Sequence, residues 1–230
     1  MKNKSYIGIA FIVLIFGIYA IPKIVDAVKN NNTIKTKGDI EILSSKIGAA
    51  SLMKFEHIPD FEFTNQDNRI IDNSFYKNKV FLVEFFFTSC PTICPKMNKN
   101  MVKIQNIFAK NENFGIVSFS IDPKRDTPEQ LKKYALEKGA TMKNWHFLTG
   151  ELEAIYKLSN QGFKLYAGEN EVAEGGFEHS GLFALIDKNG FIRSRVIKNG
   201  ENENPIKFYD GLDNEQIEWL KEDIALLLSE

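Results

Sequence analysis

One apolar run leads directly into the only two cysteines of the chain, in the stretch Val80-Phe81-Leu82-Val83-Glu84-Phe85-Phe86-Phe87-Thr88-Ser89-Cys90-Pro91-Thr92-Ile93-Cys94. The run up to Phe87 predicts a buried strand. Pro95 follows the second cysteine and is typical of the first turn of a helix, where its missing amide hydrogen leaves no bond unmade. We therefore predict a pair of thiols between the end of a core strand and the start of a helix.

The rest of the chain alternates strand and helix patterns, which predicts an α/β fold. Asn189-Gly190 between two apolar runs predicts a late hairpin. Strands are expected over 61–64, 69–71, 79–87, 115–121, 145–149, 182–186 and 191–197, and helices over 95–110, 126–138, 151–160 and after Asp213. This order predicts a thioredoxin-like, three-layer α/β/α domain, in which helices cover both faces of a mixed central sheet.

The N-terminal segment predicts a membrane anchor. Residues 5–22 are apolar and uncharged, which suits a short membrane span or a long signal-peptide core. The best cleavage position, after Ala27, is weak, so we expect an uncleaved single-pass anchor, with a cleaved signal as the alternative. Because Lys2 and Lys4 precede the span, residues 1–4 are expected in the cytoplasm and the remainder outside it.

The remaining sequence divides into a tether and one folded domain. We expect a tether over 23–57 and the thioredoxin-like domain over 58–230, held at the cell inner membrane and facing the periplasm. The 29 Lys and Arg residues nearly balance the 30 Asp and Glu residues. Charge therefore gives no support for nucleic-acid binding.

The spacing of the thiols permits either redox chemistry or metal binding. Two cysteines at positions i and i+4 of a helical turn have Cα atoms about 6 Å apart, which still permits a disulfide. A helix N-terminus stabilises a thiolate and so increases its reactivity. Two thiolates also make half of a soft metal site. A purely structural disulfide is disfavoured, because a bridge closing so short a loop constrains the unfolded chain little.

The three histidines differ in their surroundings. His57 lies at the front of the domain and His146 within an expected strand, so both favour a structural or surface role. His179 lies in a glycine-rich loop, just before an expected strand of the sheet. In a thioredoxin-like fold this loop faces the cysteine turn, where thioredoxins place a proline, and this chain has no proline between Pro128 and Pro205. His179 is therefore the candidate third ligand.

Two motifs and this histidine resemble those of the SCO/SenC family, the membrane-anchored copper chaperones of cytochrome c oxidase assembly. The motifs are Phe87-Thr88-Ser89-Cys90-Pro91-Thr92-Ile93-Cys94-Pro95 and Ser120-Ile121-Asp122-Pro123-Lys124-Arg125-Asp126-Thr127-Pro128. The resemblance covers roughly residues 58–228 and implies that Cys90, Cys94 and His179 bind one copper ion, as Cu(I), Cu(II) or both. Thr92 and Ser89 depart from the acidic residue and the histidine that many relatives carry at these positions.

The resemblance implies a metallochaperone that delivers copper to the dinuclear copper site of an oxidase subunit. The alternative is an enzyme, a thiol-disulfide oxidoreductase in which Cys90 and Cys94 form the catalytic redox pair and keep that subunit's cysteines reduced. A thiol reductant of the thioredoxin-like class is then expected as a further partner. A thiol peroxidase is disfavoured, because no arginine lies near Cys90 in the sequence.

The residues alone leave part of the site open. Asp122 and Asp126 follow the strand expected at 115–121, and either carboxylate could add an oxygen ligand or serve only in loop structure. Zinc fits two thiolates, an imidazole and a water as well as copper does. The family resemblance, together with the higher place of copper in the affinity order, favours copper.

Overall fold

The computed structural model describes residues 52–173, 175–199 and 202–230. The predicted N-terminus (1–4), anchor (5–22) and most of the tether lie outside these residues. Within the described ranges, no helix is both long enough and apolar enough to cross a membrane. Residues 53–57, which were expected to belong to the tether, form a strand of the central sheet.

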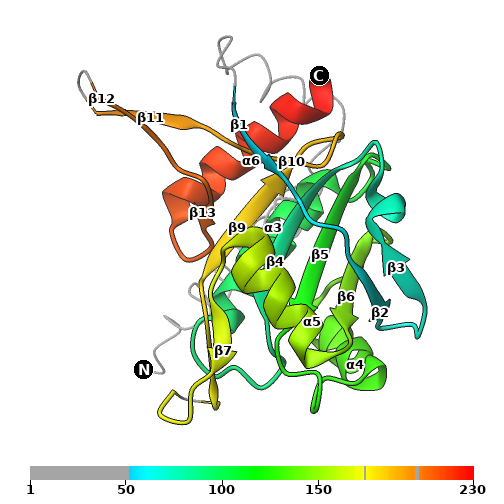
Figure 1. Ribbon diagram of the computed structural model, residues 1–230. Helices are drawn as coiled ribbons and strands as arrows, with labels where there is room; N and C mark the ends of the chain where they lie inside the picture. The colour runs from blue at the N-terminus through cyan, green and yellow to red at the C-terminus, as the bar shows by residue number, and fades with distance from the viewer. Residues whose placement is uncertain (1–51, 174, 200–201) are drawn as a thin grey trace, which may run out of the picture. The chain divides into compact units, whose positions relative to one another are not determined.

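The central sheet is mixed, as predicted (Figure 1). Its strand order is β1-β10-β9-β4-β5-β6-β2-β3, with β13 paired to β9. The central strands β4, β5 and β6 run parallel, and the flanking pairs are antiparallel. The strand bounds are β1 Met53–His57, β2 Glu62–Asn65, β3 Ile70–Asp72, β4 Val80–Phe86, β5 Phe114–Ser120, β6 Trp145–Thr149, β9 Leu182–Ile186, β10 Phe191–Ser194 and β13 Tyr209–Asp210.

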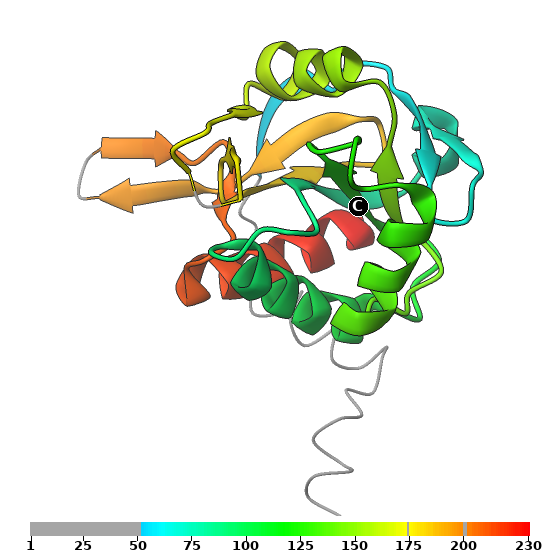
Figure 2. The ribbon, with the colours of Figure 1, turned by 90° about the horizontal axis from the view of Figure 1, so that it is seen from below.

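Helices cover both faces of this sheet, which confirms the three-layer arrangement (Figure 2). One face carries α3 (Cys94–Phe108), α4 (Pro128–Lys138) and α6 (Asn214–Ser229). The other carries α5 (Leu152–Tyr156) and a π-helix, Lys157–Phe163, which continues it. A short 3-10 helix, Asn73–Tyr76, follows β3.

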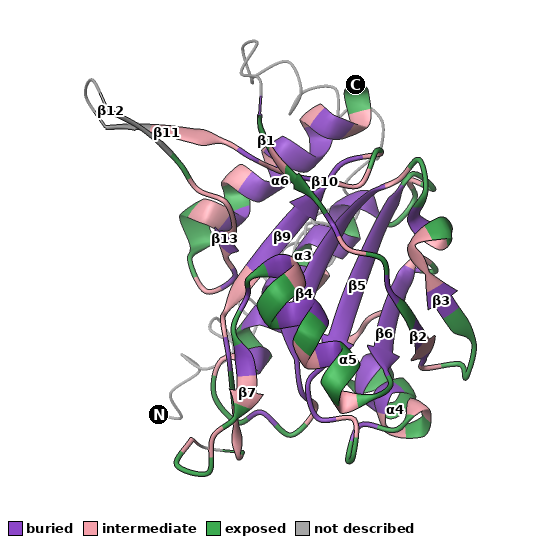
Figure 3. Ribbon diagram, in the orientation of Figure 1, coloured by how far each residue is buried: buried purple, intermediate pink, exposed green. Residues whose placement is uncertain are grey.

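The core lies between these layers and is rich in phenylalanine. Every residue of β4 and β5 is buried, as expected for central parallel strands covered on both faces (Figure 3). Phe85 and Phe119 stack on one face of the sheet, with their ring centroids 5.3 Å apart. On the other face, Phe86 meets Phe147 edge-on at 5.5 Å. The end of β4, from which the cysteine turn leads, is therefore packed against aromatic rings on both faces of the sheet.

The helix ends follow the sequence signals. Thr127 caps α4 by accepting a hydrogen bond from the backbone of Gln130, and Gly139 ends that helix in the left-handed conformation. Asp213 caps α6, as predicted from its position. The expected helix over 151–160 is different: α5 ends at Tyr156 and the chain continues as a π-helix to Phe163.

Two further hairpins lie outside the central sheet. One joins β7 (Ala167–Glu169) to β8 (Phe177–His179), in the region that the sequence suggested was a loop. The other pairs β11 (Val196–Asn199) with β12 (Asn202–Pro205), where the sequence predicted that the strand after residue 191 continues to 197. In Figure 1 the β11–β12 hairpin extends from the body of the domain. The β7–β8 hairpin carries His179.

Candidate metal centre

The two cysteines lie at the junction between β4 and α3, as predicted. After β4 the chain makes a turn in which the amide of Cys90 donates to the carbonyl of Phe87 over 3.2 Å. Cys94 is the first residue of α3, and Pro95 stands in its first turn. Both cysteines are free and buried, with exposed fractions of 8% for Cys90 and 1% for Cys94. Cys90 is therefore the thiol closer to solvent.

His179 reaches the thiols from the end of the β7–β8 hairpin. In this hairpin His179 is registered with Ala167, and the next amide, that of Ser180, donates to the carbonyl of Tyr166 over 3.0 Å. The imidazole meets the ring of Phe87 edge-on, with the ring centroids 5.8 Å apart. The end of β4 and the hairpin thus contact each other beside the site.

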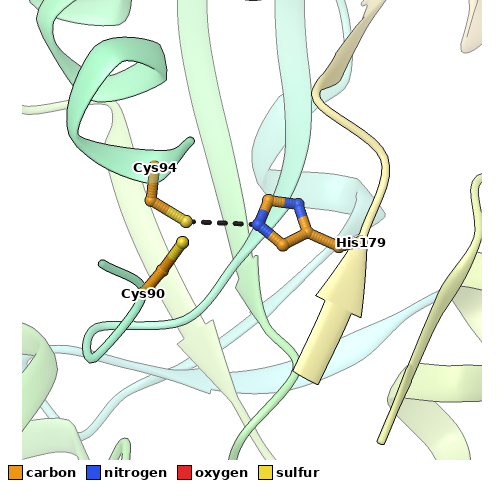
Figure 4. A group of neighbouring side chains, drawn as sticks. All are labelled: Cys90, Cys94 and His179. Atoms are coloured by element: carbon orange, nitrogen blue, oxygen red, sulfur yellow. Dashed lines mark hydrogen bonds between the residues drawn. The ribbon is translucent and has the colours of Figure 1, made fainter. Parts of the chain in front are cut away.

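The structure brings the three predicted ligand residues together (Figure 4). One donor atom each from Cys90, Cys94 and His179 lies within 4.8 Å of the other two. The Nε2 atom of His179 is 3.2 Å from the Sγ atom of Cys94. No other group of this kind occurs among the residues that the structure describes.

The hydrogen bond made by Nδ1 of His179 determines the tautomer of the ring and leaves Nε2 as the possible metal ligand. Nδ1 lies 3.0 Å from the carbonyl oxygen of Ser180, which can only accept, so Nδ1 carries the proton of the neutral ring. Nε2 then presents its lone pair to the thiols. Metal-binding histidines commonly have this arrangement, in which a backbone carbonyl orients the ring.

The pKa values of the two thiols are shifted in opposite directions. Hydrogen bonding from the neighbouring Cys94 thiol lowers the pKa of Cys90 to about 3. The hydrogen bond to Cys90, together with burial and the adjacent charge on Cys90, raises the pKa of Cys94. One thiolate and one thiol therefore share the site at neutral pH. This asymmetry suits nucleophilic attack by Cys90, and a bound cation would favour ionisation of both thiols.

Strand β4 also contains a buried carboxyl group, that of Glu84. Glu84 is fully buried, and burial raises its pKa to about 7. It accepts a hydrogen bond of 2.6 Å from the hydroxyl of Ser118, which in turn accepts one of 3.0 Å from the indole of Trp145. Glu84 has no role predicted from the sequence, although a single carboxylate within an otherwise apolar run is an identifiable signal.

The two aspartates of the second motif have structural partners. Asp126 accepts hydrogen bonds from the backbone amide of Thr88 at 3.0 Å and from the hydroxyls of Thr88 and Ser120. It therefore holds the turn that leads to Cys90. Asp122 is paired with Arg125. Neither aspartate belongs to the metal-ligand group found among the described residues, so the structure favours their loop role.

The other two histidines lie away from the thiols. His57 is exposed, and its Nδ1 atom lies 2.7 Å from the carbonyl of Ile58. His146 is buried in β6 beside Asn65, and burial lowers its pKa to about 4. These positions match the structural and surface roles that the sequence favoured.

The donor set fits a soft metal ion. Two thiolates with one imidazole suit Cu(I), and the imidazole suits Cu(II) as well. The mixed sheet, its covering helices and the dithiol at the start of α3 define a thioredoxin-like protein with a candidate thiolate–imidazole metal site. The family model described as SCO1/SenC matches residues 49–210. The chain belongs to the SCO1/SenC family.

Individual relatives agree with this assignment. The SCO1 protein homolog of Bacillus subtilis is 33% identical over 159 residues, which are 68% of this chain and 75% of that protein. A SCO1/SenC family lipoprotein from Bacillus anthracis is 32% identical with a TM-score of 0.65, covering 76% of this chain and 97% of its own. BsSco, described as having a disulfide switch and as a member of the Sco family of cytochrome c oxidase assembly proteins, is 29% identical with a TM-score of 0.60, over 79% and 96% of the chains. Arabidopsis thaliana ScoI with copper bound is 22% identical with a TM-score of 0.58, over 76% and 99%, and shares the fold.

Proposed function

We propose that this protein is a copper chaperone of cytochrome c oxidase assembly. It binds one copper ion through Cys90, Cys94 and His179 and delivers it to the dinuclear copper site of an oxidase subunit. The observation that carries the proposal is the convergence of these three donors within 4.8 Å. Family membership supports it, since the Sco relative BsSco is described as an oxidase assembly protein.

The chemistry of the donors favours copper as the ion carried. Thiolates are soft ligands that select Cu(I), and an added imidazole supports Cu(II). Zinc accepts the same donors but lies below copper in the affinity order. The site therefore accommodates copper in either oxidation state. Binding of Cu(II) depends on the imidazole more than binding of Cu(I) does.

Delivery requires a site at the surface of a domain held near its recipient. Pro91 and Thr92, between the two cysteines, are exposed, so a partner can approach the thiols at this turn. The anchor expected at 5–22 would hold the domain at the inner membrane, facing the periplasm. A membrane-bound oxidase subunit is within reach of such a domain.

The test is a copper transfer experiment with the full chain, reduced and purified in detergent. The chain is loaded with one copper ion and mixed with the metal-free copper-site subunit of the oxidase. We expect copper to move to the subunit, as measured by metal analysis of the separated proteins. Retention of copper by the chain, under conditions where free copper loads the subunit, would contradict delivery.

The acid strengths of the thiols favour a second candidate function, thiol-disulfide exchange. The Cys90 thiolate would attack a disulfide of the oxidase subunit and displace one of its thiolates. Cys94 would then give its proton to the displaced thiolate and attack the Cys90 sulfur of the mixed disulfide, releasing the subunit's second thiolate and leaving Cys90 and Cys94 joined. A thioredoxin-like reductant would supply two electrons to reopen the bridge.

His179→Ala separates the two functions, because exchange needs only the thiols. If the chain delivers copper, cells with this variant lose oxidase assembly although reduction of a disulfide substrate continues. If the variant still assembles the oxidase and reduces the substrate at the wild-type rate, copper delivery is not the main task.

A further inference from the structure

The position of His179 depends on contacts made by its hairpin. Strands β7 and β8 form a two-stranded sheet of their own and are not hydrogen-bonded into the central sheet. His179 is the last residue of β8. β9 of the central sheet begins only at Leu182, so side-chain and loop contacts also help to set the distance between the imidazole and the thiols.

One such contact comes from Arg125, in the loop between β5 and α4. Its guanidinium donates a hydrogen bond of 3.0 Å to the carbonyl oxygen of Gly175, two residues before β8. The same group lies over the ring of Phe177, 5.3 Å from its centroid. Arg125 therefore contacts both the approach to β8 and its first residue.

Asp122 orients Arg125 for this contact. The two side chains form an ion pair in which the Asp122 side chain is only 2% exposed and the Arg125 side chain is 52% exposed. A buried carboxylate needs a partner, so Asp122 restricts where the guanidinium can lie. The planar fork of arginine then has further N–H groups free for Gly175.

Gly175 also packs against the cysteine turn. Its backbone is left-handed, with φ of +89°, and a Cβ atom there would lie 2.8 Å from the ring of Phe87 and 3.3 Å from Pro91. Phe87 in turn contacts Phe177 and His179. Gly175, whose carbonyl accepts the hydrogen bond from Arg125, is thus in close contact with the segment that carries Cys90.

We propose that Arg125 is a positioning residue for the copper site, which acts through Gly175 and Phe177 to hold His179 over the two thiols. This inference rests on the proposed copper function. It implies that Arg125 affects the affinity for Cu(II) more than the affinity for Cu(I). The two thiolates suffice for a soft Cu(I) ion, whereas Cu(II) depends on the imidazole. Loss of the Arg125 contacts therefore weakens Cu(II) binding selectively.

The test compares Arg125→Gln with Lys133→Gln in the full reduced chain. Lys133 is also cationic, with its side chain 69% exposed, and pairs only with Glu137 on its own helix. Affinities are measured by competition with chelators, Cu(I) under anaerobic reducing conditions and Cu(II) with short mixing times. We expect Arg125→Gln to weaken Cu(II) binding about 10- to 100-fold, as for other residues that orient a metal ligand, with Cu(I) binding unchanged.

A spectroscopic readout distinguishes positioning from general loss of stability. The nitrogen hyperfine coupling in the electron paramagnetic resonance spectrum of the Cu(II) form reports the imidazole directly. We expect it to weaken in Arg125→Gln and to stay unchanged in Lys133→Gln. Unchanged coupling and Cu(II) affinity in a folded Arg125→Gln would overturn the proposal, whereas failure of the wild type to bind any copper would overturn the proposed function instead.

Two more variants keep the test decisive. Arg125→Lys retains the charge next to Asp122, but a single ammonium cannot make all three contacts, so we expect it to behave like Arg125→Gln. Full rescue by lysine would show that charge alone matters and would contradict the proposal. If Arg125→Gln fails to fold, as judged by circular dichroism, Phe177→Leu removes the ring that the Arg125 guanidinium covers and should give the same selective loss of Cu(II); wild-type Cu(II) binding by this variant would count against the inference.

Discussion

The Nε2 atom of His179 lies 3.2 Å from the Sγ atom of Cys94, although 85 residues separate them in the chain. Because the Nδ1–H group of His179 donates to the carbonyl of Ser180, this Nε2 atom faces the thiol with its lone pair. The contact joins the β7–β8 hairpin to the first residue of α3. A ligand that accepts both sulfur and nitrogen donors can therefore bind here without a change of ring tautomer.

The two thiols should differ in reactivity. The pKa of Cys90 is lowered to about 3, whereas that of Cys94 is raised. We expect iodoacetamide at pH 6 to modify Cys90 and to leave Cys94 largely unmodified in the reduced, metal-free chain. Fragmentation mass spectrometry of the peptide that contains both residues locates the label. Equal labelling of the two cysteines, or faster labelling of Cys94, would contradict the acid strengths assigned here.

Glu84 should make stability depend on pH. Burial raises the pKa of Glu84 in the folded protein from 4.5 to about 7. The folded protein therefore holds this proton more tightly than the unfolded chain does. The resulting contribution to the free energy of unfolding is fully present below pH 4.5 and is lost as the pH rises through 7. Between these limits the wild type should lose about 3 kcal/mol relative to Glu84→Gln, which cannot ionise. Urea unfolding of the reduced, metal-free chains from pH 4 to 8 measures this difference.

Only the difference between the two chains is interpreted, because other groups titrate in both. A gap between wild type and Glu84→Gln that stays constant from pH 4 to 8 would show that Glu84 does not remain protonated in the folded protein.

Asp126→Ala should destabilise the turn before Cys90. Substitution leaves the amide of Thr88 and the hydroxyl of Ser120 without their acceptor. Buried donors without a partner are costly, and we expect a loss of about 2–4 kcal/mol in the free energy of unfolding. Asp60→Ala, at an exposed position, is the matched control and should change stability little. If both variants unfold at the same urea concentration, Asp126 does not hold this turn.

Much of the fold could be predicted because local signals and tertiary structure agree. The apolar run into Cys90 forms β4, and Pro95 stands at the start of α3. The Asn189-Gly190 pair lies in the turn between β9 and β10, where Gly190 has φ of +82°. In these places one residue type determines the backbone conformation, so the sequence is sufficient.

The β7–β8 hairpin could not be predicted in this way. Its strands have three residues each, which is too short for a period to show. Asn160 of the π-helix supports it by hydrogen-bonding both the amide and the carbonyl of Ala167, at 2.9 Å and 2.8 Å. Such a contact between separate elements leaves no pattern in the local sequence.

The convergence of the three side chains could be predicted from the sequence, but the contacts that support them could not. Cys90, Cys94 and His179 were identifiable from residue type, neighbouring glycines and the expected topology. Arg125 and Asp126 act on partners 50 and 38 residues away, so their roles depend on the folded arrangement of the loops. Metal binding itself remains a prediction for all three donors.

The most direct test of the copper site is a Cu(II) titration of the reduced full-length chain. Wild type, Cys90→Ser, Cys94→Ser and His179→Ala are compared, with His57→Ala as a control because His57 is exposed and hydrogen-bonded only to its neighbour's carbonyl. We predict about one tightly bound Cu(II) per chain for the wild type and for His57→Ala, and its loss in the other three variants. Full retention of Cu(II) by His179→Ala would contradict the three-ligand site.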